Sequence, residues 1–203
     1  MHLFHYHLVT SRVREVEARY LGKLAFELVA RYGRIGDETA SFEAGTSWED
    51  LDARNFKLRL SELARGAVNV VVQPGQWELP RIDHFGLALE EDEFEELVER
   101  AMELDLRIQE HGGRRTFVAT GAGYRLELHP PRDWLDELLE AARELRLDEL
   151  HVRTDDPEGK AEVLAELVGV RRLGGDVEVG DALVRFLPGG PQGRPELLAE
   201  LFA

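Results

Sequence analysis

Three short segments carry the side chains of this chain that are best suited to chemistry. They are FHYHLVT (4–10) with His5 and His7, RIDHFGLAL (81–89) with His84, and GYRLELHPP (123–131) with Glu127 and His129. Imidazole and carboxylate groups bind metal ions and transfer protons. All three segments read as strands, in which residues two apart share a face. Taken alone, a histidine such as His84 is more often a hydrogen-bonded structural residue than a ligand.

The composition is that of an acidic globular protein. The chain has 203 residues, 43% hydrophobic and 32% charged, with a formal net charge of -15. This length can bury a core as one large domain or two small ones. The negative charge excludes nucleic acid as a partner, because nothing offsets repulsion from the phosphates. The absence of cysteine excludes disulfides, zinc ribbons and thiol catalysis.

No targeting or membrane segment is visible in the sequence. The N-terminal MHLFHYHLVTSRVREVE lacks a basic region followed by an apolar run, which a signal peptide would have. No stretch approaches the roughly 18 apolar residues that a membrane helix needs. We therefore expect a cytoplasmic protein with no membrane partner.

One pattern of elements is written three times along the chain. Each copy has a short strand, an amphipathic helix, and two or three strands that end at a Pro/Gly turn. In the second copy the apolar stripe of the helix consists of Phe94, Leu97, Val98, Ala101 and Met102. In the third, Asp156 before Pro157 predicts the first turn of a helix. The sequence thus predicts an α+β fold built from repeated βαβββ modules.

The predicted boundaries follow from these copies. They are a first module over 1–80 with an insertion at 33–56, a second over 81–131, a linker helix over 132–147, a third, degenerate module over 148–190, and a C-terminal helix over 191–203. The insertion is rich in Gly, Ser and Asp, and we expect one strand near 39–44. Loops of this length often cover functional sites.

A paired βαβββ module that opens on xHxxL and closes on G-[YF]-x-x-E resembles the vicinal oxygen chelate superfamily. This superfamily includes glyoxalases, bleomycin- and fosfomycin-resistance proteins, and extradiol ring-cleaving dioxygenases. The likeness is best in the second copy, where IDHFGLAL and TFVATGAGYRLELHP match, and partial in the third. The insertion and the two additional helices fall outside it.

The resemblance implies a curved sheet bowl, formed by two modules, that cups a divalent metal ion. Its ligands come from the first and last strands of each module, which implies His84 and Glu127 from the second copy. Aligning FHYHLVT with DHFGLAL makes His5 the ligand from the first copy, although a small shift would exchange it for His7. The fourth position falls at or beside Val71, where no acid stands, and Gln73 is a possible substitute.

Two imidazoles and one carboxylate favour Fe(II), with Mn, Zn or Ni as alternatives. The resemblance implies a small-molecule substrate chelated through vicinal oxygens, on a ligand set like that of the extradiol dioxygenases. Phe117 stands where those enzymes have a tyrosine, and Val71 denies the second glutamate of a glyoxalase. The nearest candidates for proton transfer are His7, Gln73 and His129.

A metal-free binding protein like the bleomycin-resistance branch is the alternative, although such a cavity has no use for His84 and Glu127. The third copy departs from the ligand pattern, with Glu149 in the place of the histidine and Val184 or Arg185 in that of the glutamate. An unpaired third module would leave an open sheet edge, which predicts a homodimer.

Overall fold

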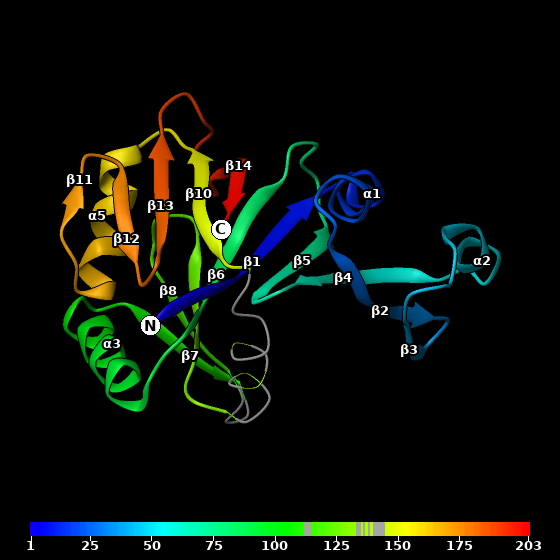
Figure 1. Ribbon diagram of the computed structural model, residues 1–203, viewed down its shortest axis with the longest axis horizontal. Coiled ribbons are helices and arrows are strands. Elements are labelled where there is room, and N and C mark those ends of the chain that lie inside the picture. Colours follow the sequence, from blue (N-terminus) through cyan, green and yellow to red (C-terminus); the bar gives the residue numbers. More distant parts are fainter. Residues whose placement is uncertain (112–114, 133–134, 136, 138, 140–144) are drawn as a thin grey trace.

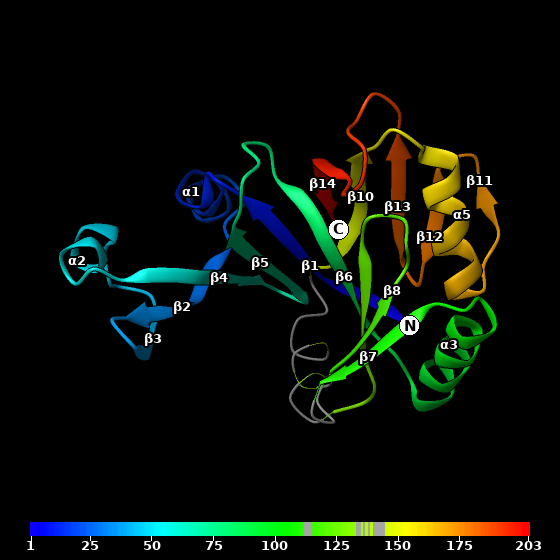
Figure 2. The same cartoon turned by 180° about the vertical axis from the view of Figure 1, so that it is seen from behind.

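The computed structural model describes residues 1–111, 115–132, 135, 137, 139 and 145–203. In this part of the chain, three βαβββ modules form one long curved sheet, which confirms the α+β class (Figures 1 and 2). Its hydrogen-bonded order is β11-β12-β13-β10-β14-β6-β1-β5-β4-β2-β3, and β9, β8 and β7 branch from β6. Within the same ranges, no helix is long and apolar enough to span a membrane.

The first module contains the predicted insertion. Its elements are β1 (His2–Thr10), α1 (Val13–Lys23), β2 (Glu27–Ile35), β3 (Glu38–Phe42), α2 (Trp48–Ala53), β4 (Lys57–Arg65) and β5 (Val68–Pro74). The strand expected in the insertion is β3, whereas α2 was not predicted. This short helix begins after Ser47, whose hydroxyl accepts from the backbone of Asp50 while the Asp50 carboxylate accepts in return.

The insertion packs against α1, at one end of the molecule (Figure 1). On α1, the Glu17 carboxylate accepts from Trp48 Nε1 at 2.9 Å, from Ser61 Oγ at 2.6 Å, and from two Arg31 nitrogens at 2.6 and 2.9 Å. Because neighbouring residues of a strand point to opposite faces, Ser61 faces α1 and Glu62 faces the other side of the sheet. The insertion therefore covers the helix side of the sheet.

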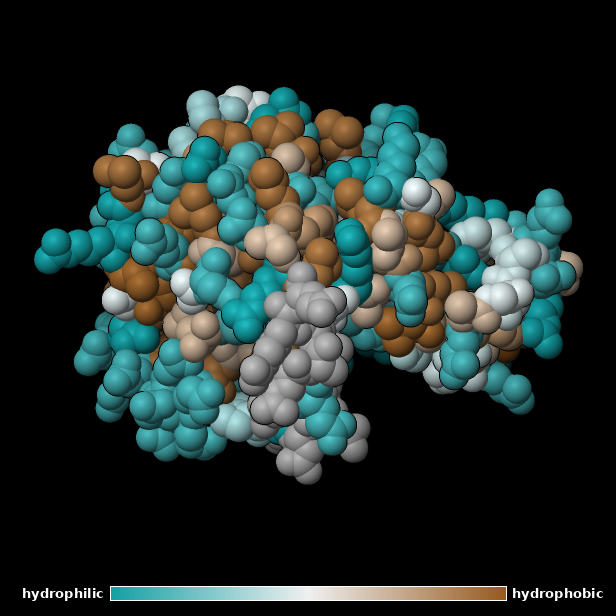
Figure 3. Space-filling model, viewed as in Figure 1, coloured by the Kyte–Doolittle hydropathy of each residue, from teal (hydrophilic) through white to brown (hydrophobic). Residues whose placement is uncertain are grey.

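The second module has no insertion. Its elements are β6 (Arg81–Ala88), α3 (Glu91–Glu103), β7 (Arg107–His111), β8 (Arg115–Ala119) and β9 (Arg125–His129). Leu97 and Ala101 of α3 are fully buried, and Phe94 and Val98 pack beside them. Met102, also predicted in this stripe, is 59% exposed. The acidic outer face of α3 forms the hydrophilic lower left of Figure 3.

The first and second modules join through β1 and β6, which pair antiparallel. His5 lies opposite Gly86, and His7 lies opposite His84. His5 and His84 are separated by the same number of positions as His7 and Gly86. An approximate two-fold axis between the strands therefore exchanges the cross-strand pair His5–Gly86 with the cross-strand pair His84–His7. This symmetry makes His5 equivalent to His84 and His7 equivalent to Gly86, as in the alignment of the two copies made from sequence.

Each of these strands also carries one extra residue. Leu3 and His5 face consecutive residues of β6, which leaves Phe4 without an opposite partner. Asp83 holds the equivalent place in β6, between Ile82 and His84. Such a β-bulge bends the strand and changes the direction of a side chain.

The third module repeats the pattern. Its elements are β10 (Leu147–Arg153), α5 (Pro157–Val168), β11 (Arg172–Leu173), β12 (Asp176–Val179) and β13 (Ala182–Leu187), followed by β14 (Glu196–Phe202). As predicted, the Asp156 side chain accepts from Gly159 N at the start of α5, and Pro157 is its first residue. Gly169 ends this helix with φ of 74°, in the left-handed region that glycine tolerates.

The predicted C-terminal helix is wrong, because residues 196–202 form the strand β14. The letters ELLAELF favour a helix by propensity, but β14 pairs antiparallel with β10 over nearly its whole length. Phe202 also packs against Phe26, with ring centroids 5.5 Å apart. Pairing and packing thus outweigh local propensity. The helix predicted over 132–147 lies mostly outside the described residues, and Leu147, its last residue, begins β10.

One hydrophobic core runs through all three modules. It extends from Leu3 of β1 through Leu97 of α3 to Phe186 of β13. β14 lies on β10 as β6 lies on β1, so the edge of the third module that predicted a homodimer is covered within the chain. The homodimer and the cytoplasmic location stay predictions.

Candidate metal centre

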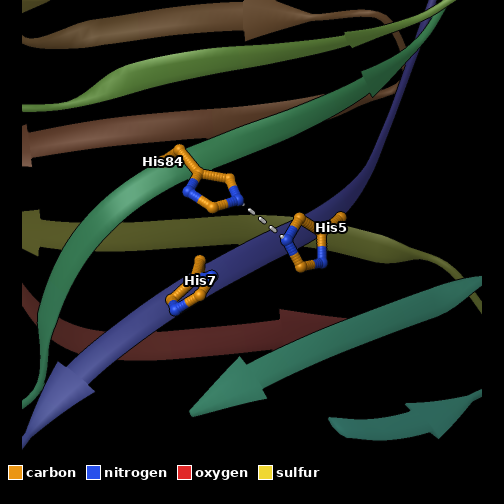
Figure 4. Close-up of side chains that lie close together, drawn as sticks. All are labelled: His5, His7 and His84. Carbon is orange, nitrogen blue, oxygen red and sulfur yellow. Dashed lines mark hydrogen bonds between the residues drawn. The ribbon is translucent and has the colours of Figure 1, made fainter. Parts of the chain in front are cut away.

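The three predicted ligands meet on one face of the sheet, where β1, β6 and β9 lie side by side. His5 Nε2 lies 3.2 Å from His84 Nε2 and 3.7 Å from Glu127 Oε2. His84 Nε2 and Glu127 Oε2 are 3.1 Å apart. Figure 4 shows the two imidazoles directed toward each other from neighbouring strands. His5 and His84 are 4% exposed, and Glu127 is 3% exposed.

These separations suit a shared ion. Nitrogen and oxygen ligands lie about 2.0–2.2 Å from a first-row divalent metal, so two ligands of one ion lie about 3.0–3.8 Å apart. All three distances among His5, His84 and Glu127 fall in that range. The donor set therefore fits a divalent ion without rearrangement of the backbone.

The other ring nitrogen of each histidine is occupied. His5 Nδ1 lies 2.7 Å from Asn69 Oδ1, and the Asn69 amide donates to Glu62 Oε1 at 2.9 Å, which fixes its orientation. His84 Nδ1 lies 2.8 Å from Asp83 Oδ2. Since both partners are acceptors, we assign the proton to Nδ1 in each ring. The two Nε2 lone pairs then face each other, an arrangement that a cation stabilises.

The buried surroundings favour the ligand forms of these groups. Burial, and then repulsion from His84, lowers the pKa of His5 to about 3, so the ring is neutral at pH 7. For Glu127, burial acts to raise the pKa, but the neighbouring His129, His84 and His5 side chains outweigh it and hold the pKa well below its usual range. The centre thus offers a neutral imidazole at His5 and an ionised carboxylate at Glu127.

His7 lies next to the predicted ligands. One ring nitrogen of His7 lies within 4.8 Å of one ring nitrogen each of His5 and His84, so the three histidines form a second possible donor group. However, His7 Nε2 lies 3.1 Å from Gln73 Oε1, an acceptor that directs this nitrogen away from the ion. The pairing with Gln73 therefore favours His5 over His7 as the ligand.

The last strand of the first module supplies no acid at the fourth ligand position. In the parallel pairing of β1 and β5, Val71 lies beside His7. Glu127 has the equivalent place beside Gly86 in the parallel pairing of β6 and β9. Glu62 of β4 is the cross-strand partner of Val71, and its carboxylate is engaged with Asn69. The fourth position therefore offers no carboxylate, and three predicted ligands remain.

Other residues surround the donor atoms. His129 Nε2 and Arg115 Nε lie 3.5 and 3.4 Å from Glu127 Oε1. The edge of Phe117 contacts the His84 ring, with centroids 5.2 Å apart. Tyr124 points away from the centre, and its hydroxyl donates to the Lys160 carbonyl at 2.8 Å.

The equivalent place in the third module has different chemistry. Glu149 holds the position of His5, His151 that of His7, and Arg185 that of Glu127. His151 Nε2 lies 2.5 Å from Glu149 Oε2, and Arg185 Nε lies 3.3 Å from Asp176 Oδ1. These groups pair with one another, and the absence of a metal from this module stays a prediction.

Two cavities lie away from the candidate centre. One, of about 310 Å³, is lined by Met1, His2, Leu139, Arg146 and Asp181. The other, of about 430 Å³, lies between residues 11–15 and Trp48, and Phe56 and Lys57 also line it. Neither contains a member of the candidate centre, whose donor atoms are almost closed off.

Sequence reasoning missed four residues that hold this centre in place: Glu62, Asn69, Asp83 and Arg194. Asn69 had a visible signal, because it stands two residues before Val71 in a strand already aligned with the closing glutamate strand. Asp83 had none, because strict alternation places its side chain on the face opposite His84. Only the bulge at Asp83 brings the two together.

Solved structures with the same fold are known, although no protein-family model and no curated protein sequence matches this chain significantly. A Mn(II)-bound glyoxalase from Novosphingobium aromaticivorans superposes with a TM-score of 0.56 at 9% identity, over 97% of this chain and 63% of that one. A halotolerant catechol dioxygenase gives 0.58 at 13% identity, over 97% and 68%.

A variant of 4-hydroxymandelate synthase from Streptomyces coelicolor gives a TM-score of 0.57 at 13% identity, over 98% of this chain and 64% of that one. This chain thus spans less than two thirds of the glyoxalase and of the synthase. At such low identities the likenesses establish the fold alone, which this chain shares with these glyoxalase, dioxygenase and synthase structures.

Proposed function

We propose that this chain, which has the vicinal oxygen chelate fold, binds a divalent metal ion through His5, His84 and Glu127. A small molecule with two adjacent oxygens would be the substrate, chelated at the open positions of the ion. One observation carries the proposal: three donor atoms from three strands lie 3.1–3.7 Å apart, with both imidazole Nδ1 atoms engaged elsewhere.

Fe(II) is the favoured ion, because two imidazoles and a carboxylate with open positions suit it, and Mn, Zn and Ni are alternatives. When bound, the ion would act as a Lewis acid toward the chelated oxygens. An apolar Val71 at the fourth position favours a three-ligand, extradiol-like centre over a glyoxalase-like one. We therefore favour ring cleavage of a catechol, with dioxygen as the co-reactant.

The surrounding residues would hold protons and shape the site. His7 donates from Nε2 to Gln73, which leaves its Nδ1 lone pair to accept a hydrogen bond from a substrate hydroxyl. His129 and Arg115 approach Glu127 Oε1, and so help to keep Oε2 directed at the histidines. Phe117 supplies an apolar wall beside His84, in the place where a ring-cleaving enzyme has a tyrosine.

Metal content and activity test this proposal. The protein is purified without an affinity tag, stripped, and reconstituted anaerobically with Fe(II), Mn(II), Zn(II) or Ni(II), and then given a panel of catechols and hemithioacetals. We expect about one ion per chain. His84→Ala should abolish binding, whereas His151→Ala removes a histidine from the unused position of the third module and should retain it.

Two outcomes contradict the proposal. A wild-type protein that takes up no ion after reconstitution has no metal centre, and the metal-free binding protein becomes the better hypothesis. A protein that binds the ion equally well after His84→Ala has its centre elsewhere. Turnover of hemithioacetals in place of catechols would keep the metal centre but overturn ring cleavage.

A further inference from the structure

Asp83 is the most heavily engaged acid near the centre. It is 7% exposed, and its Oδ2 accepts from His84 Nδ1 at 2.8 Å. Two guanidinium groups bind the same carboxylate: Arg125 at Oδ2, and Arg194 at Oδ1 with a distance of 2.6 Å. This aspartate therefore links a candidate metal ligand to two arginines.

The partners of His5 and His84 break the approximate symmetry of the two modules. In the parallel strand pairs, Asn69 lies beside His5 and Arg125 lies beside His84. Asn69 accepts from His5 Nδ1, but an arginine has no acceptor atom and cannot do the same for His84. The bulge residue Asp83 supplies the missing acceptor, and Arg125 binds Asp83 in place of the ring.

Arg194 comes from the segment that follows the third module, and this segment is firmly anchored. Pro195 O accepts from Ile82 N at 2.8 Å, beside Asp83. Gly193 O accepts from Lys160 Nζ of α5 at 3.0 Å. A side chain at Gly123 would meet this carbonyl at 2.1 Å, so the turn before β9 fits closely against the segment. These contacts hold the Arg194 backbone at the edge of β6.

We propose that Asp83 and Arg194 are positioning residues for His84, so that the third module contributes to the metal centre through its C-terminal segment. The inference rests on the proposed function in that His84 is a metal ligand. Arg194 fixes the Asp83 carboxylate so that Oδ2 faces the imidazole. Asp83 then holds the His84 proton on Nδ1 and directs the Nε2 lone pair at Glu127 and His5.

This assigns to the third module a role that its own side chains do not suggest. The position equivalent to the metal centre in that module lacks the ligands, but its C-terminal segment reaches back to the second module. Removing a side chain that hydrogen-bonds to a metal-binding histidine typically weakens metal affinity by about 10- to 100-fold. Arg194 is one residue further from the ion, so we expect the lower end of that range.

The test compares Arg194→Met with Arg185→Met. Both arginines are partly exposed, at 37% and 35%, and both bind an acid, but Arg185 binds Asp176 and Glu149 away from the centre. Imidazole ¹⁵N NMR of the metal-free protein reports the His84 tautomer. Titration of the same metal-free protein with Co(II), followed by its visible absorption, reports the dissociation constant.

In wild type and Arg185→Met we expect a protonated Nδ1 and an unprotonated Nε2 on His84. Arg194→Met should show a mixture of the two tautomers and about a 10-fold weaker affinity for Co(II). Arg194→Lys restores the positive charge and should recover part of both signals. Melting temperatures of the metal-free variants should match, which separates positioning from a general loss of stability.

The two proposals can fail separately. If wild-type protein shows the Nδ1 tautomer and Arg194→Met disturbs it, but neither binds Co(II), the metal function is overturned and the positioning role stands. If wild type binds Co(II) and Arg194→Met leaves tautomer and affinity unchanged, the positioning role is overturned and the metal function stands. An equal loss of affinity in Arg185→Met would also overturn it.

Discussion

At the scale of the residue, the candidate centre depends on a small side chain as much as on its donors. Gly86 lies opposite His5 in the sheet, in the place that His7 has in the first module. A Cβ atom at Gly86 would meet His5 Cβ at 2.7 Å and Cδ2 at 2.9 Å. The glycine therefore makes room for the His5 ring to lie across β6.

Replacing Gly86 with alanine should displace this ring. We expect Gly86→Ala to weaken metal affinity at least about 10-fold and to cost about 1–3 kcal/mol of stability through overpacking. Gly22→Ala is the control, because nothing lies within 4 Å of a Cβ there and alanine favours the α1 helix. Metal titration and thermal unfolding of both variants check the prediction. Unchanged affinity in Gly86→Ala would remove His5 from the ligand set.

The sequence predicted the donors of the centre better than their supports. His84 and Glu127 stand in recognisable motifs, and the alignment of the two copies chose His5 over His7. Asp83 and Arg194 could not be predicted, because their contacts arise from a bulge and from a segment more than a hundred residues away. Side chains that coordinate leave a local pattern in sequence, whereas those that orient them act through tertiary contacts.

At the scale of the element, pairing decided what periodicity could not. The helices α3 and α5 were predicted from apolar stripes and caps, which are local signals. The strand β14 was mistaken for a helix, because seven residues rich in Leu and Glu satisfy either period and only β10 selects the strand. The insertion had no periodicity to interpret, and its place is set by Trp48, which donates to Glu17, and by the Thr46 carbonyl, which accepts from Arg31.

The ion pair of Arg31 with Glu17, on which the insertion packs, gives a prediction about stability. Arg31 and Glu17 side chains are 6% and 3% exposed, so Arg31→Met leaves a buried carboxylate without its cation and should cost about 3–5 kcal/mol. Arg14→Met breaks the exposed pair with Asp52 and should change stability little. Urea unfolding measures both. Metal affinity should be the same in both variants, since the pair lies on the helix side of the sheet; a loss in Arg31→Met alone would contradict that placement.

At the scale of the whole molecule, the metal-free protein must tolerate a cluster of buried imidazoles. Burial, followed by repulsion from His84, lowers the pKa of both His5 and His7 to about 3, against an ordinary value of 6.5. The unfolded chain therefore takes up protons at these histidines below pH 6.5, whereas the folded chain does not. Stability from this source is present above pH 6.5 and is lost progressively as the pH falls toward 3.

Between pH 7.5 and pH 5, each of these histidines should lower the free energy of unfolding of the metal-free protein by about 2 kcal/mol. Urea unfolding at several pH values measures the effect. A His7→Gln variant should show a smaller pH dependence, because one of the two depressed pKa values is gone. Equal pH dependence in wild type and variant would mean that His7 does not contribute.

The pairing of β14 with β10 has a consequence for experiments on this chain. One backbone frame occurs twice: at β1 and β6 it presents His5 and His84, and at β10 and β14 it presents Glu149 and Ala199. Every molecule therefore carries a donor-poor copy of its own candidate centre, folded under the same conditions and at the same concentration. Any property common to both copies belongs to the architecture, and any difference between them belongs to the side chains.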